Sequence, residues 1–205
     1  MGRIWGRCIC YVDVLVIDTR VRPHLQGILG PIGKFLAGLG VTPAAMTGFG
    51  LVVTIVGAVL IGMGDLAVGA AVALVGSALD GLDGTVARAS GSVTDRGAFL
   101  DSASDRIGEI AGFAGLAVAM EGKGRILLLI VLSVGGAMLV PYLRARAESV
   151  GVDGRNGVMG RAERVILFAL GLMTGWVEPM LWVMVISVWL TAIYRFLTSY
   201  RAIKT

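Results

Sequence analysis

The chain has 205 residues, of which 56% are hydrophobic and only 16% are charged, and its mean hydropathy is +0.84. Soluble domains carry about 25% charged residues, so this composition excludes an ordinary soluble enzyme and indicates an integral membrane protein. The net charge of +4 is small, and we expect no nucleic-acid partner. With one histidine and two cysteines, neither a multi-histidine metal centre nor a disulfide framework is expected.

The N-terminal part differs from the rest of the chain. Residues 1–21 are expected to be a peripheral or disordered leader, because Asp13 interrupts the apolar core that a signal peptide needs. Residues 22–205 are expected to form one membrane domain. Its first part, 22–39, mixes apolar residues with glycines, a proline and a lysine. This pattern is too interrupted for a span and predicts an interfacial amphipathic helix.

Six apolar stretches follow this segment. A spanning helix needs about 20 residues, so six of them use most of the remaining chain. Thr42 and Pro43, just before the first stretch, are a helix-start signal of N-cap residue and first-turn proline. We therefore expect an all-α integral membrane protein with six transmembrane helices preceded by the N-terminal interfacial amphipathic helix. The six predicted spans are 44–64, 66–90, 98–120, 125–143, 163–177 and 179–197.

Basic residues are distributed unevenly between the connections. The connections near 64–66, 121–125 and 175–180 contain only two basic residues, Lys123 and Arg125. Most other lysines and arginines would lie at the opposite end of the spans. The positive-inside rule places that end, with both termini, in the cytoplasm. We expect a multi-pass protein of the plasma membrane whose active site faces the cytoplasm.

Four aspartates lie where the second and third stretches become polar, in the segment 80–105, DGLDGTVARASGSVTDRGAFLDSASD. Carboxylates in spans are costly and mark functional sites. Asp80 and Asp83 are three residues apart and Asp101 and Asp105 are four apart, spacings that place each pair on one helical face. If the two faces meet, the four carboxylates suit hard divalent cations. Two cations would balance the four charges, and two-metal sites catalyse displacement at phosphorus.

Other residues near the aspartates extend this interpretation. Gly84 leaves room for a ligand to approach the helix backbone, and Arg88 has a planar fork suited to phosphate. Glu109 continues the acidic stripe from Asp105, and we expect it to support the site or to pair two helices. Taken singly, these residues have structural explanations such as packing, anchoring or ion pairing. Taken together, they predict a polar cavity open to the cytoplasm.

The segment resembles the signature of the CDP-alcohol phosphatidyltransferase family, D-x2-D-G-x2-A-R-x8-G-x3-D-x3-D. Every fixed position is met, by Asp80, Asp83, Gly84, Ala87, Arg88, Gly97, Asp101 and Asp105. The resemblance implies a transferase of phospholipid biosynthesis that moves a phosphatidyl group from CDP-diacylglycerol to an alcohol and releases CMP. The family usually forms homodimers, so the resemblance also implies a homodimer in membrane lipid.

The resemblance also implies roles for individual residues. The metal ligands would be Asp80, Asp83, Asp101 and Asp105, holding two ions, usually Mg²⁺ with Mn²⁺ as the alternative. Asp105 would also be the catalytic general base. Contacts to the CDP-linked lipid are implied for Ala44, Ala45, Met46, Thr47, Gly84, Arg88 and Thr94.

A second basic cluster bears on the acceptor alcohol. Arg144, Arg164 and Arg195 are similar in placement to a lysine and two arginines that bind the acceptor phosphate in the bacterial phosphatidylinositol phosphate synthases of this family. The resemblance implies inositol 1-phosphate as acceptor. Arg144 takes the lysine's place and changes reach and geometry, so glycerol 3-phosphate, serine and free inositol stay open as acceptors. An ether-lipid donor also stays open, and membrane anchoring alone is the other explanation of the arginines.

A divalent-cation transporter is the non-enzymatic alternative. Many transporters show inverted repeats and interrupted helices in both halves of the chain. Here the four aspartates fall in one predicted hairpin, 80–105. The sequence therefore favours the enzyme.

Overall fold

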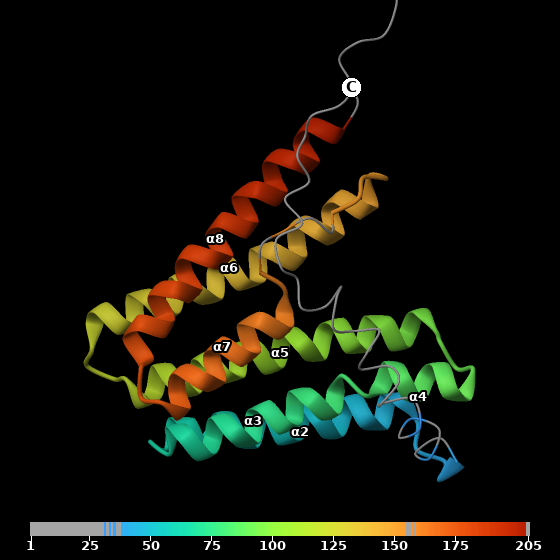
Figure 1. The fold of residues 1–205 in the computed structure, drawn as a ribbon, viewed down its shortest axis with the longest axis horizontal. Coiled ribbons are helices and arrows are strands. Elements are labelled where there is room, and N and C mark those ends of the chain that lie inside the picture. The colour runs from blue at the N-terminus through green and yellow to red at the C-terminus, as the bar shows by residue number, and fades with distance from the viewer. Residues whose placement is uncertain are drawn as a thin grey trace, which may run out of the picture.

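The computed structural model describes residues 31, 33, 35, 38–154, 157 and 159–203. Within this part of the chain the regular secondary structure is all helical (Figure 1). The helices are α2 (Pro43–Gly62), α3 (Leu66–Asp80), α4 (Asp83–Ser90), α5 (Asp95–Ala119), α6 (Gly124–Ser149), α7 (Arg161–Met173) and α8 (Val177–Ala202). The predicted leader and nearly all of the predicted interfacial helix lie outside the described residues.

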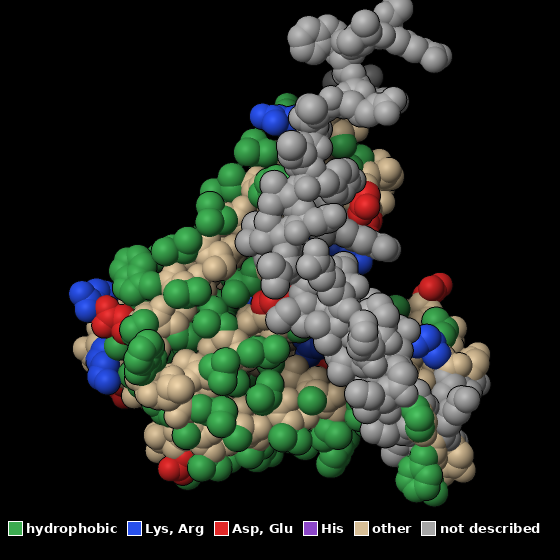
Figure 2. All heavy atoms as spheres, in the orientation of Figure 1, with side chains coloured by type: hydrophobic (Ala, Val, Ile, Leu, Met, Phe, Trp, Pro, Cys, Tyr) green, Lys and Arg blue, Asp and Glu red, His purple; other side chains and the backbone are tan. Residues whose placement is uncertain are grey.

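Among the described residues, four segments are long and apolar enough to cross a membrane. They are α2, α6, α8 and the stretch Leu66–Arg88, which includes α3. Their mean hydropathy ranges from 1.5 to 2.4. The predicted spans 98–120 and 163–177 are present as α5 and α7, but α5 carries several charged residues and α7 has only 13 residues. Figure 2 shows apolar side chains over much of the flank, with charged side chains mainly towards the ends. An apolar flank of this kind suits a membrane protein.

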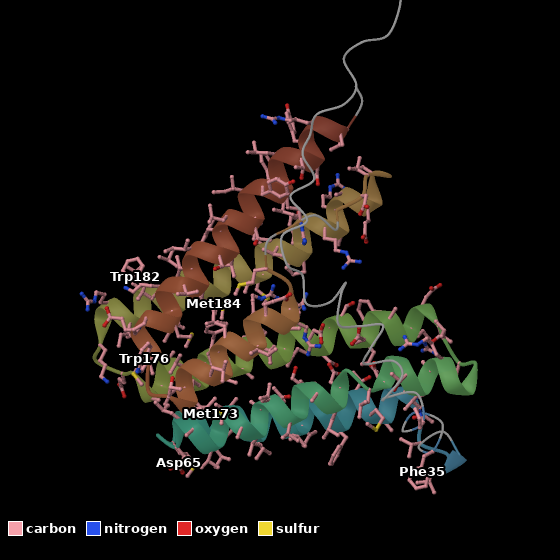
Figure 3. All side chains as sticks on the ribbon, in the orientation of Figure 1. Phe35, Asp65, Met173, Trp176, Trp182 and Met184 are labelled. Atoms are coloured by element: carbon pink, nitrogen blue, oxygen red, sulfur yellow. The ribbon has the colours of Figure 1, made fainter. Side chains whose placement is uncertain are left out.

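The helices form one bundle. α2 packs against both α3 and α5, α3 contacts α7, and α6 pairs with α8 (Figure 1). The connections after α2, α5 and α7 lie at one end of the bundle, whereas the turn between α4 and α5 lies at the other. Figure 3 shows Asp65 and Trp176 at the first end and Phe35 at the second. The aspartate segment is therefore separated from the short connections that hold few basic residues.

The core lies among α5, α6, α7 and α8. Its most deeply buried side chains include Leu116, Leu172, Leu181 and Met184. The rings of Phe113 and Phe168 meet edge to face with centroids 5.0 Å apart, which joins α5 to α7. Aromatic pairs prefer this arrangement. The contact holds the middle of α7 beside α5, about two turns beyond Asp105.

Small residues set the distance between α2 and α3. A side-chain Cβ at Gly57 would lie 2.5 Å from the backbone nitrogen of Ala73, and one at Gly50 would lie 2.8 Å from the backbone nitrogen of Asp80. Real atoms do not approach this closely, so only glycine fits at these two positions. Small residues are the usual means by which membrane helices pack closely. The packing of α2 therefore fixes the backbone position of Asp80.

The second predicted span is interrupted, which corrects the prediction of one continuous helix. α3 ends at Asp80 and α4 begins at Asp83. The backbone N–H of Leu82 donates to the carbonyl of Leu79 at 3.1 Å, three residues back, so the turn tightens at this point. Asp80 and Asp83 consequently lie on two successive helices.

Candidate functional site

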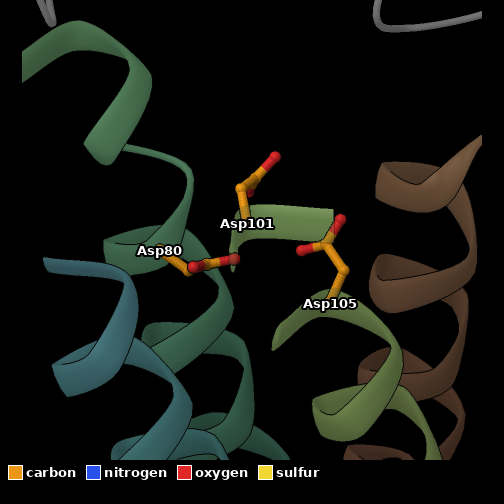
Figure 4. A group of neighbouring side chains, drawn as sticks. All are labelled: Asp80, Asp101 and Asp105. Atoms are coloured by element: carbon orange, nitrogen blue, oxygen red, sulfur yellow. The ribbon is translucent and has the colours of Figure 1, made fainter. Parts of the chain in front are cut away.

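Three of the four aspartates converge. Asp80 is the last residue of α3, and Asp101 and Asp105 lie one turn apart on α5 (Figure 4). One carboxylate oxygen of each lies within 4.8 Å of those of the other two. We call these three residues the aspartate cluster. Oxygen atoms at this separation suit a hard divalent cation, so the cluster indicates divalent metal use.

The two innermost carboxylates of the cluster are strongly buried. The side chain of Asp80 is 5% exposed and that of Asp105 is 12% exposed. The Oδ1 atom of Asp80 is buried and accepts no hydrogen bond from the described residues. A buried carboxylate oxygen without a partner is costly. Its presence at the centre of the cluster is what a cation-binding site would show without its ion.

Asp83 lies beside the aspartate cluster, close enough to Asp80 and Asp101 to interact with them electrostatically. Its Oδ2 accepts a hydrogen bond of 2.6 Å from the Oγ1 of Thr47, a buried residue of α2. The hydroxyl thus holds the Asp83 carboxylate at the start of α4. Of the four aspartates in the signature, the structure brings three into one group and ties the fourth to α2.

Arg161, which the sequence analysis did not identify, lies inside the cluster. Its Nη2 atom is 2.7 Å from Oδ1 of Asp105, 3.1 Å from Oδ2 of Asp80 and 3.2 Å from Oγ of Ser77. Arg106, from α5 itself, pairs with the other oxygen of Asp105 at 3.3 Å. Arg161 is the first residue of α7 and lies 56 residues beyond Asp105 in the chain. No local sequence spacing predicts the contact of Arg161 with Asp80 and Asp105, because it depends on how α7 packs in the bundle.

Arg164 lies one turn further along α7 and forms a two-point ion pair with Glu109. Its Nε and Nη2 donate to the two carboxylate oxygens of Glu109 at 2.6 and 3.2 Å. The arginine side chain is 3% exposed and the glutamate 9%. Glu109 therefore pairs α5 with α7, as expected from the sequence. A paired charge of this kind is well satisfied in a buried setting.

The other two predicted acceptor arginines lie on α6 and α8. The Nη1 of Arg195 donates to the backbone carbonyl of Val140 at 2.7 Å, and the residue is buried. Arg144 is exposed and its Nε donates to Glu148 at 2.9 Å. Arg195 is close enough to both Arg144 and Arg164 to interact with them electrostatically. The three arginines therefore lie in one region, and each is held by a protein group.

The start of α2 supplies four of the residues predicted to contact the CDP-linked lipid. Thr42 caps the helix, with its Oγ1 accepting a hydrogen bond from the N–H of Ala45 at 3.2 Å. This confirms the helix start predicted from sequence. Ala44 and Ala45 are exposed, whereas Met46 and Thr47 are buried. The two alanines are thus accessible, and Thr47 acts on the site through Asp83.

The other predicted lipid contacts are Gly84 and Arg88 on α4 and Thr94 at the start of α5. A Cβ at Gly84 would lie 3.4 Å from Nη1 of Arg88, so the glycine leaves space beside the guanidinium. Thr94 caps α5, with its Oγ1 accepting a hydrogen bond of 3.1 Å from the N–H of Gly97. The chain turns before Thr94 because Gly91 ends α4 with a φ of 64°. Thr94 therefore has a structural role whatever it binds.

A cavity of about 60 Å³ lies against the cluster, among α2, α3, α5 and α7. Its charged lining consists of Asp80, Asp105, Glu109, Arg161 and Arg164. The remaining wall is mostly apolar, including Leu51, Phe113 and Phe168. A cavity of this size holds on the order of four water molecules. The predicted polar cavity is present, but polar side chains form only part of its wall.

The fold and the site define a class of membrane enzyme. A family model for CDP-alcohol phosphatidyltransferases matches residues 40–194. The chain therefore belongs to the CDP-alcohol phosphatidyltransferase family and is a transferase. This confirms the resemblance seen in the signature and favours the enzyme over the transporter.

Curated relatives are similar over nearly the whole chain. The archaetidylinositol phosphate synthase of Pyrococcus horikoshii is 32% identical over 178 residues, which cover 86% of this chain and 93% of the relative. The phosphatidylinositol phosphate synthase of Mycobacterium marinum is 34% identical over 190 residues, covering 90% of this chain and 81% of the relative.

Solved structures of the phosphatidylinositol phosphate synthase of Mycobacterium tuberculosis have a similar fold. The structure with CDP-DAG bound has a TM-score of 0.78 and 30% identity, covering 84% of this chain and 94% of that chain. The structure in complex with manganese and citrate has a TM-score of 0.79 and 29% identity, covering 84% and 88%.

Proposed function

We propose that this protein transfers a phosphatidyl group from CDP-diacylglycerol to inositol 1-phosphate, forming phosphatidylinositol phosphate and releasing CMP. The observation that carries the proposal is the convergence of Asp80, Asp101 and Asp105 within the family signature. The similar Mycobacterium tuberculosis synthase with CDP-DAG bound supports the donor. An ether-linked donor remains the alternative, because one relative is an archaetidylinositol phosphate synthase.

The residues present fit divalent metal ions. The aspartate cluster offers oxygen ligands within 4.8 Å of one another, and the buried Oδ1 of Asp80 has no hydrogen-bond partner among the described residues. We propose that Asp80, Asp83, Asp101 and Asp105 hold two ions, Mg²⁺ or Mn²⁺. When bound, such ions supply positive charge beside the pyrophosphate and the leaving CMP. The manganese complex of the similar synthase supports this assignment.

The chemical step needs one proton acceptor. A hydroxyl oxygen of the acceptor forms a bond to the lipid-side phosphorus, and the bond between that phosphorus and the CMP oxygen breaks. The hydroxyl proton passes to a carboxylate oxygen of Asp105, which is the general base. Phosphoryl transfer otherwise depends on positioning and on electrostatic stabilisation. Asp105 is suited to the role because it is largely buried within the cluster.

The CDP-linked donor is assigned to residues around the cluster. Arg88 would bind a phosphate of the pyrophosphate, and Gly84 leaves space beside its guanidinium. Thr94 and the start of α2, Ala44 to Thr47, would contact the cytidine part. Ala44 and Ala45 are exposed at the helix N-terminus, which favours anionic groups. The acyl chains would remain in the surrounding lipid.

The acceptor phosphate is assigned to Arg144, Arg164 and Arg195. Arg195 interacts electrostatically with both of the other arginines, so three positive side chains gather in one region, which suits an anionic acceptor better than a neutral one. The named relatives differ in their lipid, but both names include inositol phosphate. Glycerol 3-phosphate is the second candidate because it carries the same anionic group.

The proposed membrane arrangement adds α5 and α7 to the four candidate spans, for six in total, within one domain over residues 22–205. The low number of basic residues in the connections after α2, α5 and α7 supports a cytoplasmic position for the opposite end. The site would therefore face the cytoplasm from the plasma membrane. CMP would leave into water while the lipid product stays in the bilayer. We also propose a homodimer, as is usual in the family.

A panel of acceptors tests the proposal. Detergent-purified protein with CDP-diacylglycerol and Mg²⁺ should release CMP in the presence of inositol 1-phosphate and much less with glycerol 3-phosphate, inositol or serine. Release with one of the other acceptors would retain the aspartate mechanism and overturn the assignment of the arginines. No release with any acceptor, repeated with an ether-linked donor, would contradict the proposed function.

A further inference from the structure

Arg161 is placed as a cation would be placed in the aspartate cluster. A single nitrogen, Nη2, approaches both Asp105 at 2.7 Å and Asp80 at 3.1 Å. The two carboxylates come from different helices, α5 and α3, and Arg161 comes from a third. One positive group therefore bridges the two most deeply buried acids of the proposed metal site.

The position of Arg161 is not explained by the helix that carries it. It is the first residue of α7, where the helix dipole disfavours positive charge. It receives compensation from the two carboxylates, whose mutual repulsion in a buried setting would otherwise be severe. The position of Arg161 therefore stabilises the two carboxylates of the cluster and does not stabilise α7.

We propose that Arg161 is the internal counter-ion of the aspartate cluster and competes with divalent metal for Asp80 and Asp105. The inference rests on the proposed function, since it takes the cluster as the metal site. Without metal, the guanidinium positions the two carboxylates and balances part of their charge. A metal ion on the same oxygens repels the guanidinium and replaces it. Arg161 is therefore a positioning residue whose contacts are exchanged when the site is loaded.

The neighbouring Arg164 shows why the exchange is assigned to Arg161 and not to the next arginine on α7. Arg164 is 3% exposed and binds both oxygens of Glu109, so its charge is already balanced away from the cluster. The side chain of Arg161 is 31% exposed and therefore has solvent beside it into which it can move. Its bonds to Asp80 and Asp105 are made by one nitrogen and are more easily exchanged than a two-point pair.

Mn²⁺ binding measured by electron paramagnetic resonance tests the competition without any substrate. The proteins are wild type, Arg161→Gln, Arg161→Lys and, as matched control, Arg106→Gln, all purified in detergent with Mn²⁺ and then stripped of metal. Arg106 also pairs with Asp105, at 3.3 Å, and its replacement removes the same charge. If Arg161 occupies the site about nine-tenths of the time, its removal should tighten the Mn²⁺ Kd about tenfold. Arg106→Gln should change it less than about threefold, and Arg161→Lys should stay close to wild type.

Thermal unfolding supplies a second readout that an ordinary structural role would not produce. Arg161→Gln should lower the Tm of the metal-free protein and leave the Tm of the Mn²⁺-saturated protein at the wild-type value. Equal losses with and without Mn²⁺, or an unchanged or weaker Mn²⁺ Kd, would overturn the inference. Equal tightening in Arg106→Gln would overturn it too, because the effect would then be one of general charge.

The same titration separates this inference from the proposed function. If wild type binds Mn²⁺ and Asp80→Asn binds it more weakly, the metal site is supported. If the Arg161 variants then behave like wild type, only the inference on Arg161 fails. If wild type binds no Mn²⁺ at the metal concentrations that support CMP release, the metal site itself is contradicted.

Discussion

The aspartate cluster and the arginine region (Arg144, Arg164 and Arg195) differ in how fully their polar atoms are paired with other groups of the protein. In the cluster, carboxylates from α3 and α5 approach within 4.8 Å of one another, and one buried oxygen of Asp80 has no hydrogen-bond partner among the described residues. In the arginine region, Arg164 binds Glu109, Arg195 binds a backbone carbonyl and Arg144 binds Glu148. In the cluster, Arg161 pairs with Asp80 and Asp105 and still leaves one buried Asp80 oxygen that a cation would satisfy, whereas each of the three arginines has a protein partner.

This difference separates what helix packing can preorganise from what a ligand must rearrange. Glycine contacts between α2 and α3 fix the backbone of Asp80, so a metal meets a placed ligand and displaces only the side chain of Arg161. An acceptor phosphate must instead compete with existing partners of the arginines, which costs affinity. Changes in the cluster should therefore act on the rate of transfer, and changes in the arginine region on the KM for the acceptor.

The largest effect is expected for Asp105→Asn. Removing the general base should lower the rate of CMP release by about a thousandfold, while the amide, similar in shape, should leave the fold intact. CMP release at saturating substrates and thermal unfolding measure the two quantities. A variant that keeps the full rate would show that another group accepts the proton.

Gly57→Ala should break the preorganisation of the cluster. The added Cβ would lie 2.5 Å from the backbone nitrogen of Ala73, so α2 and α3 must separate. Such overpacking costs about 1–3 kcal/mol in the free energy of unfolding, and because α2 positions Asp80, activity should fall as well. Thermal unfolding in detergent measures the loss.

The matched control for this change is Gly48→Ala on the same helix. No atom lies within 4 Å of a Cβ placed at Gly48, and alanine favours the helix over glycine. Its Tm should be unchanged or slightly raised. Equal losses in the two variants would contradict the close packing of α2 on α3.

Arg195→Lys should act on the acceptor alone. Lysine keeps the charge but loses the planar fork, so the KM for inositol 1-phosphate should rise about tenfold. The KM for CDP-diacylglycerol should stay unchanged, because the donor is assigned to other residues, on α2 and α4 and at the start of α5. Initial rates over both substrate concentrations give the two constants. A rise confined to the donor KM would place Arg195 in the donor site.

The smallest effect is expected for Thr47→Val. The change removes the 2.6 Å hydrogen bond to Asp83 without altering side-chain volume much. A hydrogen bond to a charged group contributes about 1.5–3 kcal/mol at most, and an exposed route to water recovers part of it. The concentration of Mg²⁺ that gives half-maximal CMP release should therefore rise severalfold. An unchanged value would show that Asp83 does not depend on Thr47 for its role.

The sequence predicted the helices better than their breaks and contacts. Thr42 and Pro43 marked the start of α2 correctly because helix capping is local. The interruption after Asp80 was missed, since only Gly81 and Leu82 separate α3 from α4 and the backbone merely tightens into a turn there. Local chemistry was enough to predict the cap of α2, and it gave no signal for this turn.

The site residues show the same contrast between what local sequence predicts and what depends on long-range packing. The signature brought the aspartates to attention because Asp80 lies three residues before Asp83 and Asp101 lies four before Asp105, which are helical spacings. Arg161 could not be found by spacing, since it reaches the cluster only when α7 packs beside α3 and α5. The pairing of Arg164 with Glu109 likewise joins residues 55 apart in the chain. Long-range ion pairs of this kind follow from the bundle and not from any local pattern.

The most direct test of the central claim is the dependence of transfer on divalent metal and on the cluster together. CMP release from CDP-diacylglycerol and inositol 1-phosphate is measured after chelation and after Mg²⁺ is restored, in wild type and in Asp101→Asn. The account predicts that chelation abolishes release, that Mg²⁺ restores it in wild type, and that the variant stays inactive at the same concentration. Release that persists in chelator, or a variant as active as wild type, would contradict a metal-dependent site at the aspartate cluster.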